Sequence, residues 1–318
     1  MTKLLLLFAG TLAFSLQVDG RRSWGSCPEV QLVGNFDPQL YTAPAGERIA
    51  SSNPAFTCMV TASSLVLPFT VVIALWFFST GLVAMLNHRL RQSFGRAVFI
   101  AGICASLGLA LLVFTSHSTA VWATYASFVG GLLIWSWHEI SFLTGAVAGT
   151  HRDVCPNGAK GWQRFSLATM ALIHHEIALA MTAALLLSLS TVTANPTGAY
   201  AFALLLVFRL SSKLNIYWGV PNMSDELLPL HLGYLKSYFG PKRLNVMLLA
   251  SIALIIGLSA YLVNQAVTAV RPNEVVQASL LCCLCLLAAL EHIFLAIPFR
   301  DSALWGWALE TKNNKKLS

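Results

Sequence analysis

Three apolar stretches of this chain each carry a glutamate with at least one histidine beside it. A charged side chain near the centre of a bilayer costs about 2.5 kcal/mol or more, so such groups usually face a bundle interior, a partner or a cofactor. The recurrence in three stretches therefore predicts one shared polar layer with a function. Its acidic and imidazole groups are His138 and Glu139, then His174, His175 and Glu176, then Glu291 and His292.

Two basic residues, Arg209 and Lys213, lie in a fourth apolar stretch. Their spacing of four places both on one face of a helix. Counted from the ends of the stretches at 1.5 Å per residue, all these groups are expected roughly 10 to 15 Å from the same membrane face. In one interpretation, the two cations neutralise the three carboxylates. The ion pairs would then hold the helix bundle together and carry out no chemistry.

The histidines allow three functional interpretations, since a buried imidazole is usually neutral. A neutral imidazole can bind the magnesium of a chlorin or the iron of a haem. Alternatively, the Glu and His side chains can hold two iron atoms, although adjacent Glu and His diverge by about 100° and fit the Glu-x-x-His pattern poorly. A proton relay in a transporter is the third interpretation, without support from broken helices or inverted repeats. The metal-ligand candidates are Glu139, His175, Glu176, Glu291 and His292.

The composition of the chain indicates that these residues lie within a membrane. The chain has 318 residues, of which 56% are hydrophobic and 10% charged, and its mean hydropathy is +0.68. Soluble domains have about a quarter of their residues charged, so we expect an all-α, polytopic membrane helix bundle. The net charge of +7 is scattered between apolar stretches and lies in no nucleic-acid-binding motif, which argues against a nucleic-acid partner.

Seven apolar windows are long enough for the ~20 residues that a spanning helix needs. We therefore expect about seven transmembrane helices in a bundle over residues 61–310, with a basic cytoplasmic tail at 311–318. The windows are 63–86, 97–115, 121–149, 165–191, 197–219, 244–270 and 275–298.

The distribution of Lys and Arg predicts the orientation. The connections after the first, third and fifth windows, like the tail, are rich in basic residues, whereas 116–120 and 193–198 have none. The C-terminus is therefore expected in the cytoplasm and the N-terminus in the periplasm of a bacterial inner membrane. An amphipathic segment between the fifth and sixth windows, residues 222–235, is expected to lie along the membrane surface.

The N-terminal part has a different composition. Residues 1–20 resemble a signal peptide, with Lys3 before a short apolar core. Residues 27–41 resemble the start of secreted lipocalins, but no barrel strand follows. We expect residues 21–60 to be a poorly ordered extracytoplasmic leader.

Beyond these patterns, residues 66–309 resemble the PuhE family of photosynthetic complex assembly proteins. The resemblance rests on an ordered set of motifs. They are Trp76-Phe77-Phe78-Ser79-Thr80-Gly81, Trp137-His138-Glu139-Ile140-Ser141-Phe142, Gly161-Trp162-Gln163-Arg164-Phe165, His175-Glu176-Ile177-Ala178, Arg209-Leu210-Ser211-Ser212-Lys213-Leu214-Asn215, Glu226 with Pro229 and His231-Leu232, and Glu291-His292 with Leu304-Trp305-Gly306-Trp307-Ala308-Leu309.

The resemblance implies a multi-pass protein of the photosynthetic membrane. It would act in assembly of the reaction centre and light-harvesting complex, with their subunits or pigment-synthesis proteins as partners, or modulate bacteriochlorophyll supply. We expect a non-enzymatic factor whose polar layer holds bacteriochlorophyll, a precursor of it, or a metal. The alternative is a membrane oxidoreductase with an iron-binding Glu/His site acting on a tetrapyrrole or another lipophilic substrate.

Overall fold

The computed structural model describes residues 62–89, 94–223 and 228–297. The expected signal peptide, leader and basic tail lie outside these ranges. Within them the regular structure is entirely helical, with no strand, which confirms the all-α fold class. Five helices are long and apolar enough to cross a membrane, as expected of a polytopic membrane bundle.

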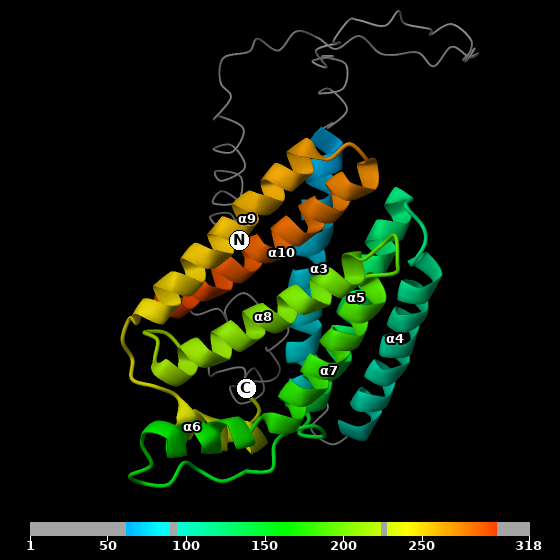
Figure 1. The fold of residues 1–318 in the computed structure, drawn as a ribbon. Coiled ribbons are helices and arrows are strands. Elements are labelled where there is room, and N and C mark those ends of the chain that lie inside the picture. The colour runs from blue at the N-terminus through cyan, green and yellow to red at the C-terminus, as the bar shows by residue number, and fades with distance from the viewer. Residues whose placement is uncertain (1–61, 90–93, 224–227, 298–318) are drawn as a thin grey trace, which may run out of the picture. The chain divides into compact units, whose positions relative to one another are not determined.

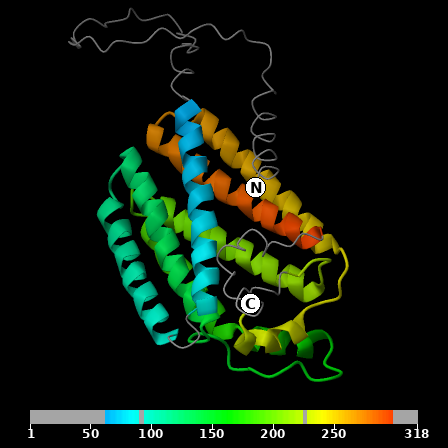
Figure 2. The same ribbon diagram turned by 180° about the vertical axis from the view of Figure 1, so that it is seen from behind.

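The described part of the chain contains seven helices of 18 residues or more, which are the bundle in Figures 1 and 2. Two of them, α3 and α5, are not among the five that meet the spanning criterion. The apolar part of α3 is the shorter stretch Val66–Leu82, and α5 carries Ser, His and Glu side chains in its second half. The seven are α3 (Ala62–Arg89), α4 (Phe94–Thr115), α5 (Val121–Leu143), α7 (Ile173–Ser190), α8 (Thr197–Trp218), α9 (Val246–Thr268) and α10 (Pro272–Ala296).

Helix α10 is the centre of the bundle, and α4 lies on its outside (Figure 1). In α10, 78% of the spanning window is buried, against 11% in α4. α10 packs against α3, α5, α8 and α9, whereas α4 packs mainly against α5. The large apolar side chains exposed on α4, such as Phe99 and Phe114, are therefore the face that lipid would cover.

Helices α5 and α8 approach each other backbone to backbone. A Cβ atom added at Gly131 would collide with the carbonyl of Gly198, and one at Gly198 would collide with the carbonyl of Ser127. Ser127 Oγ also accepts a hydrogen bond of 3.0 Å from Gly198 N. Small residues at such crossings let two membrane helices come close, and this crossing aligns the polar residues further along both helices.

Two of the expected windows differ from the structure. The window 121–149 ends as a helix at Leu143, and the window 165–191 is broken into α6 (Gly161–Met170) and α7. Gly149 packs against the backbone of Met170 and Ala171, and His151 N donates to the Met170 carbonyl over 3.4 Å. The chain therefore turns at this contact.

The segment after α8 closes the same end of the bundle. Residues 224–227 of the expected amphipathic segment lie outside the described ranges, and Leu230–Tyr238 form a 3-10 helix, η2. Leu232 and Leu235 of η2 pack with Phe142 of α5 in one buried apolar cluster. Arg164 of α6 donates to the carbonyl of Tyr238 over 2.7 Å, so α6 and η2 lie together below the bundle in Figure 1.

Candidate functional site: ion pairs between three helices

Five of the predicted site residues come together where α5, α7 and α8 meet, and we call them the charged cluster. Arg209 Nη2 lies 3.1 Å from Glu139 Oε2, and Lys213 Nζ lies 2.5 Å from Glu176 Oε1. The two cations are one turn apart on α8, so each reaches a different neighbouring helix. The charged cluster consists of Glu139, His175, Glu176, Arg209 and Lys213.

His175 is the buried centre of the charged cluster. The residue is 0% exposed, and its ring lies 4.7 Å from the ring of Phe142. Lys213 Nζ lies 5.5 Å from the centroid of the same Phe142 ring. His175 is therefore enclosed by an aromatic ring and the two ion pairs.

Two polar groups of the charged cluster face each other without a hydrogen bond. His175 Nε2 lies 4.0 Å from Glu139 Oε1, which is too long for a direct hydrogen bond. Neither atom is hydrogen-bonded to any described residue, and the same holds for His175 Nδ1. Because buried polar groups are normally paired, one small polar group hydrogen-bonded to both atoms would satisfy them.

Arg209 is the most exposed member of the charged cluster. Its side chain is 44% exposed, against 14% for Glu139, although it lies near the middle of α8. Its hydrogen bond to Glu139 uses one guanidinium nitrogen, Nη2, while a guanidinium has five N–H donors. Arg209 thus neutralises Glu139 and still presents donors outside the bundle.

Glu291 and His292 are hydrogen-bonded to residues outside the charged cluster, and the Glu291 carboxylate also attracts Arg209. Glu291 is exposed, and its Oε1 accepts a hydrogen bond of 3.0 Å from Trp76 Nε1 of α3. The fully buried His292 lies 2.8 Å through Nδ1 from the Ala288 carbonyl and 3.0 Å through Nε2 from Ser211 Oγ. A carbonyl only accepts, so Nδ1 donates and Nε2 accepts. The Nδ1 bond lies within α10, and the Nε2 bond joins α10 to α8.

Within the described part of the chain, the remaining two histidines form no ion pair and no hydrogen bond with the charged cluster. His138 is buried between the rings of Trp137 and Phe202, and its Nε2 lies 3.1 Å from Thr182 Oγ1 of α7. His174 is exposed on α7. The break before α7 places His174 in the first turn of a helix, whereas the sequence predicted a position about ten residues inside one.

The fit of a metal or a chlorin can be judged from these positions. No group of three or more His, Cys, Asp or Glu side chains that could hold a metal ion occurs among the described residues. A chlorin ring does not fit beside His138, His175 or His292, which are 4%, 0% and 0% exposed. His174 is the histidine of the predicted set with an open ring.

Sequence reasoning missed the neutral residues that complete these contacts. Asn215 Nδ2 donates to Ser251 Oγ over 3.0 Å and to the Ser211 carbonyl over 3.0 Å. The polar pair Ser211 and Asn215 has the same spacing of four as Arg209 and Lys213 on the same helix, which was the available signal.

The fold and these contacts define a class of protein: a polytopic helical membrane protein whose helices are joined by ion pairs within the bundle. The chain matches the family described as "Protein of unknown function (DUF3623)" over residues 62–316, and it belongs to that family. It is also similar to an uncharacterized 30.4 kDa protein in the puhA 5′ region of Rhodobacter capsulatus. The identity is 32% over 242 residues, which cover 74% of this chain and 88% of the relative. No solved structure matches.

Proposed function

We propose that this protein is a membrane assembly factor for the bacterial photosynthetic reaction centre and light-harvesting complex, or a modulator of the bacteriochlorophyll supply to it. The relative in the puhA 5′ region lies in a photosynthesis gene region, and this supports the resemblance to the PuhE family. The proposed partners are subunits of these complexes or pigment-synthesis proteins, within the lipid bilayer.

The observation that carries the proposal is the exposure of Arg209. A half-exposed guanidinium in a spanning helix is costly against lipid, and it becomes favourable when a partner or a pigment supplies acceptors. The exposed carboxylate of Glu291, held by Trp76, attracts Arg209 and adds an acceptor beside its donors. Exposed charged groups at this depth are typical of a surface that recognises another membrane component.

The proposed localisation is the bacterial inner membrane, with α6 and η2 on the cytoplasmic side. The connections at that end carry Arg152, Lys160, Lys236, Lys242 and Arg243, whereas the connections at the other end carry only Arg271. A reporter fused after Ser318 is then expected to be cytoplasmic, and one inserted into residues 193–198 periplasmic. The reverse result would contradict this orientation.

The proposal is tested in a phototrophic bacterium from which the gene has been deleted. We expect the wild-type gene to restore the near-infrared absorbance of assembled complexes, and Arg209→Gln to restore only a fraction of it. Immunoblotting of membranes reports the amount of each variant. The matched control is Arg243→Gln, which removes an exposed cation outside the spanning helices and should restore the complexes fully.

Arg209→Lys separates recognition from neutralisation. Lysine keeps the positive charge beside Glu139 but lacks the planar fork of donors, so this variant should accumulate normally and still assemble fewer complexes. Full assembly with Arg209→Lys would show that Arg209 only neutralises Glu139, and the proposed recognition role would be wrong.

A further inference from the structure

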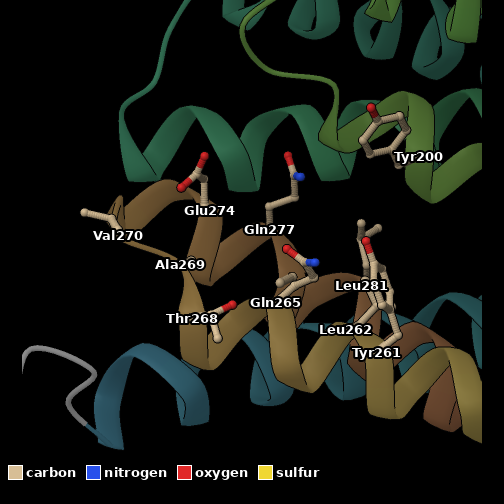
Figure 3. Close-up of a pocket in the computed structure, with 11 residues that line it drawn as sticks. Tyr200, Tyr261, Leu262, Gln265, Thr268, Ala269, Val270, Glu274, Gln277 and Leu281 are labelled. Atoms are coloured by element: carbon tan, nitrogen blue, oxygen red, sulfur yellow. The ribbon is translucent and has the colours of Figure 1, made fainter. Parts of the chain in front are cut away.

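A second site lies at the opposite end of the bundle, where α9 turns into α10 (Figure 3). It is a pocket of about 490 Å³ between α8, α9 and α10, within the range of about 300 to 1,000 Å³ typical of small-molecule sites. Its walls are Tyr200, Tyr261, Leu262, Gln265, Thr268, Ala269, Val270, Glu274, Gln277, Ala278 and Leu281.

The polar groups of this pocket include hydrogen-bond donors from two amides and two phenols. Thr197 Oγ1 lies 2.9 Å from Gln277 Oε1 and 2.8 Å from Asn195 Oδ1, which share its one hydroxyl proton. The Gln277 amide nitrogen donates to no described residue. Gln265 contributes a second amide, and Tyr200 and Tyr261 contribute phenolic hydroxyls. The N–H and O–H donors of this set can bind a ligand that offers carbonyl oxygens.

The pocket carries no unbalanced charge. Among the eleven lining residues, Glu274 is the one whose side chain is charged near neutral pH. It is paired with Arg271, which precedes α10. Apolar side chains such as Leu262, Val270 and Leu281 complete the walls. A charged ligand would therefore find no counter-ion here, and a lipophilic one would find apolar contact.

Two exposed tyrosines lie at one edge of the pocket. Tyr200 is 40% exposed and Tyr261 is 57% exposed, and Figure 3 shows their rings at one edge of the lining. A tyrosine combines an apolar ring with a polar end, which suits the boundary between lipid and water. A ligand can thus reach the amides from the bilayer.

We propose that this pocket binds an uncharged lipophilic molecule through a carbonyl group, with Gln265 and Gln277 as the hydrogen-bond donors. A lipophilic quinone and an ester-linked neutral lipid share this chemistry. The site is separate from the charged cluster, so it adds a ligand-binding activity to the function proposed above and does not depend on it.

The test uses the purified full-length protein and titration calorimetry with four probes. Decylubiquinone and dioctanoylglycerol have the carbonyl groups that the proposal requires, dodecane lacks a polar end, and laurate is charged. We expect one or both carbonyl probes to bind at least about tenfold more tightly than dodecane and laurate. The tighter of the two identifies the source as a quinone or an ester lipid.

Gln265→Leu is the decisive variant, because no described residue is hydrogen-bonded to its amide, whereas Gln277 also holds Thr197. It should weaken binding of the carbonyl probe by about tenfold and leave dodecane unchanged. Tyr261→Phe, which removes one hydroxyl, should weaken it less. The control Gln163→Leu, at the other end of the bundle on α6, should bind as the wild type does.

The proposal is overturned by any of three results. These are carbonyl probes that bind no better than dodecane, laurate that binds most tightly, and a folded Gln265→Leu protein with unchanged affinity for the carbonyl probe.

Discussion

The charged cluster and the pocket are two polar sites on one helix, and they are built in opposite ways. Tyr200 of α8 lines the pocket, and Arg209 of the same helix lies about nine residues, or roughly 13 Å, further along. In the charged cluster, full charges from three helices neutralise one another. In the pocket, neutral amides and hydroxyls surround an open space, and its one carboxylate is paired outside it.

This difference indicates that the charged cluster holds helices together, whereas the pocket is suited to hold a ligand. Each ion pair joins α8 to another helix, so loss of one partner leaves a charge within the bundle. The side chains of the pocket have few partners inside the protein, which leaves their donors to a ligand. We therefore expect substitutions in the charged cluster to lower stability, and substitutions in the pocket to change binding.

The largest expected effect comes from breaking an ion pair of the charged cluster. Glu139→Gln leaves Arg209 without its counter-ion, and loss of one partner from a buried pair costs about 3 to 5 kcal/mol. The lower end applies, because the Arg209 side chain is 44% exposed. Thermal unfolding in detergent measures the change.

The matched control is Glu274→Gln at the pocket end. Its partner Arg271 is 64% exposed, and exposed pairs contribute about 0 to 1 kcal/mol. Equal losses for Glu139→Gln and Glu274→Gln would remove the distinction between the two sites.

A smaller effect is expected at the crossing of α5 and α8, on which both sites depend. Gly198→Ala places a methyl group against the Ser127 carbonyl, and such overpacking costs about 1 to 3 kcal/mol. Gly257→Ala on α9 is the control, since an added Cβ there meets nothing within 4 Å. A measured stability of Gly198→Ala equal to that of Gly257→Ala would show that the crossing is loosely packed.

Some of this architecture could be predicted from particular residues. The spacing of Arg209 and Lys213 predicted one helix face, and the depth of Glu139 and Glu176 predicted their closeness to it. The sequence also grouped Glu291 with them, and the Glu291 carboxylate lies close enough to attract the charge of Arg209. Depth along a helix did not predict the hydrogen bond that Glu291 accepts from Trp76 of α3.

The break between α6 and α7 could not be predicted from an apolar window. It depends on contact of Gly149 with the backbone at Met170 and Ala171, which are more than 20 positions away. The pocket was missed for a similar reason. Gln265, Gln277 and Tyr200 are ordinary residues near helix ends, and only packing of α8 against α9 and α10 gives them a common space.

The smallest expected effect on stability, and the sharpest test of the charged cluster, comes from its histidine. His175→Phe replaces a fully buried ring whose nitrogens have no hydrogen-bond partner among the described residues. Removing unpaired polar atoms from the interior is close to neutral, so we expect a change in stability within about 1 kcal/mol. His292→Phe is the control, because it breaks bonds to Ala288 and Ser211 and leaves buried groups unpaired at a cost of about 1 to 3 kcal/mol.

The same two variants separate a structural from a functional histidine in the deletion strain described above. If His175 and Glu139 together hold a small polar group that the assembly function requires, His175→Phe should accumulate in the membrane at the wild-type level and fail to restore the complexes. The loss of complexes in His292→Phe should instead follow its lower abundance on immunoblots. Full restoration by a stable His175→Phe protein would show that the unpaired imidazole has no part in the function, and would leave the outward-facing donors of Arg209 as the active feature of the charged cluster.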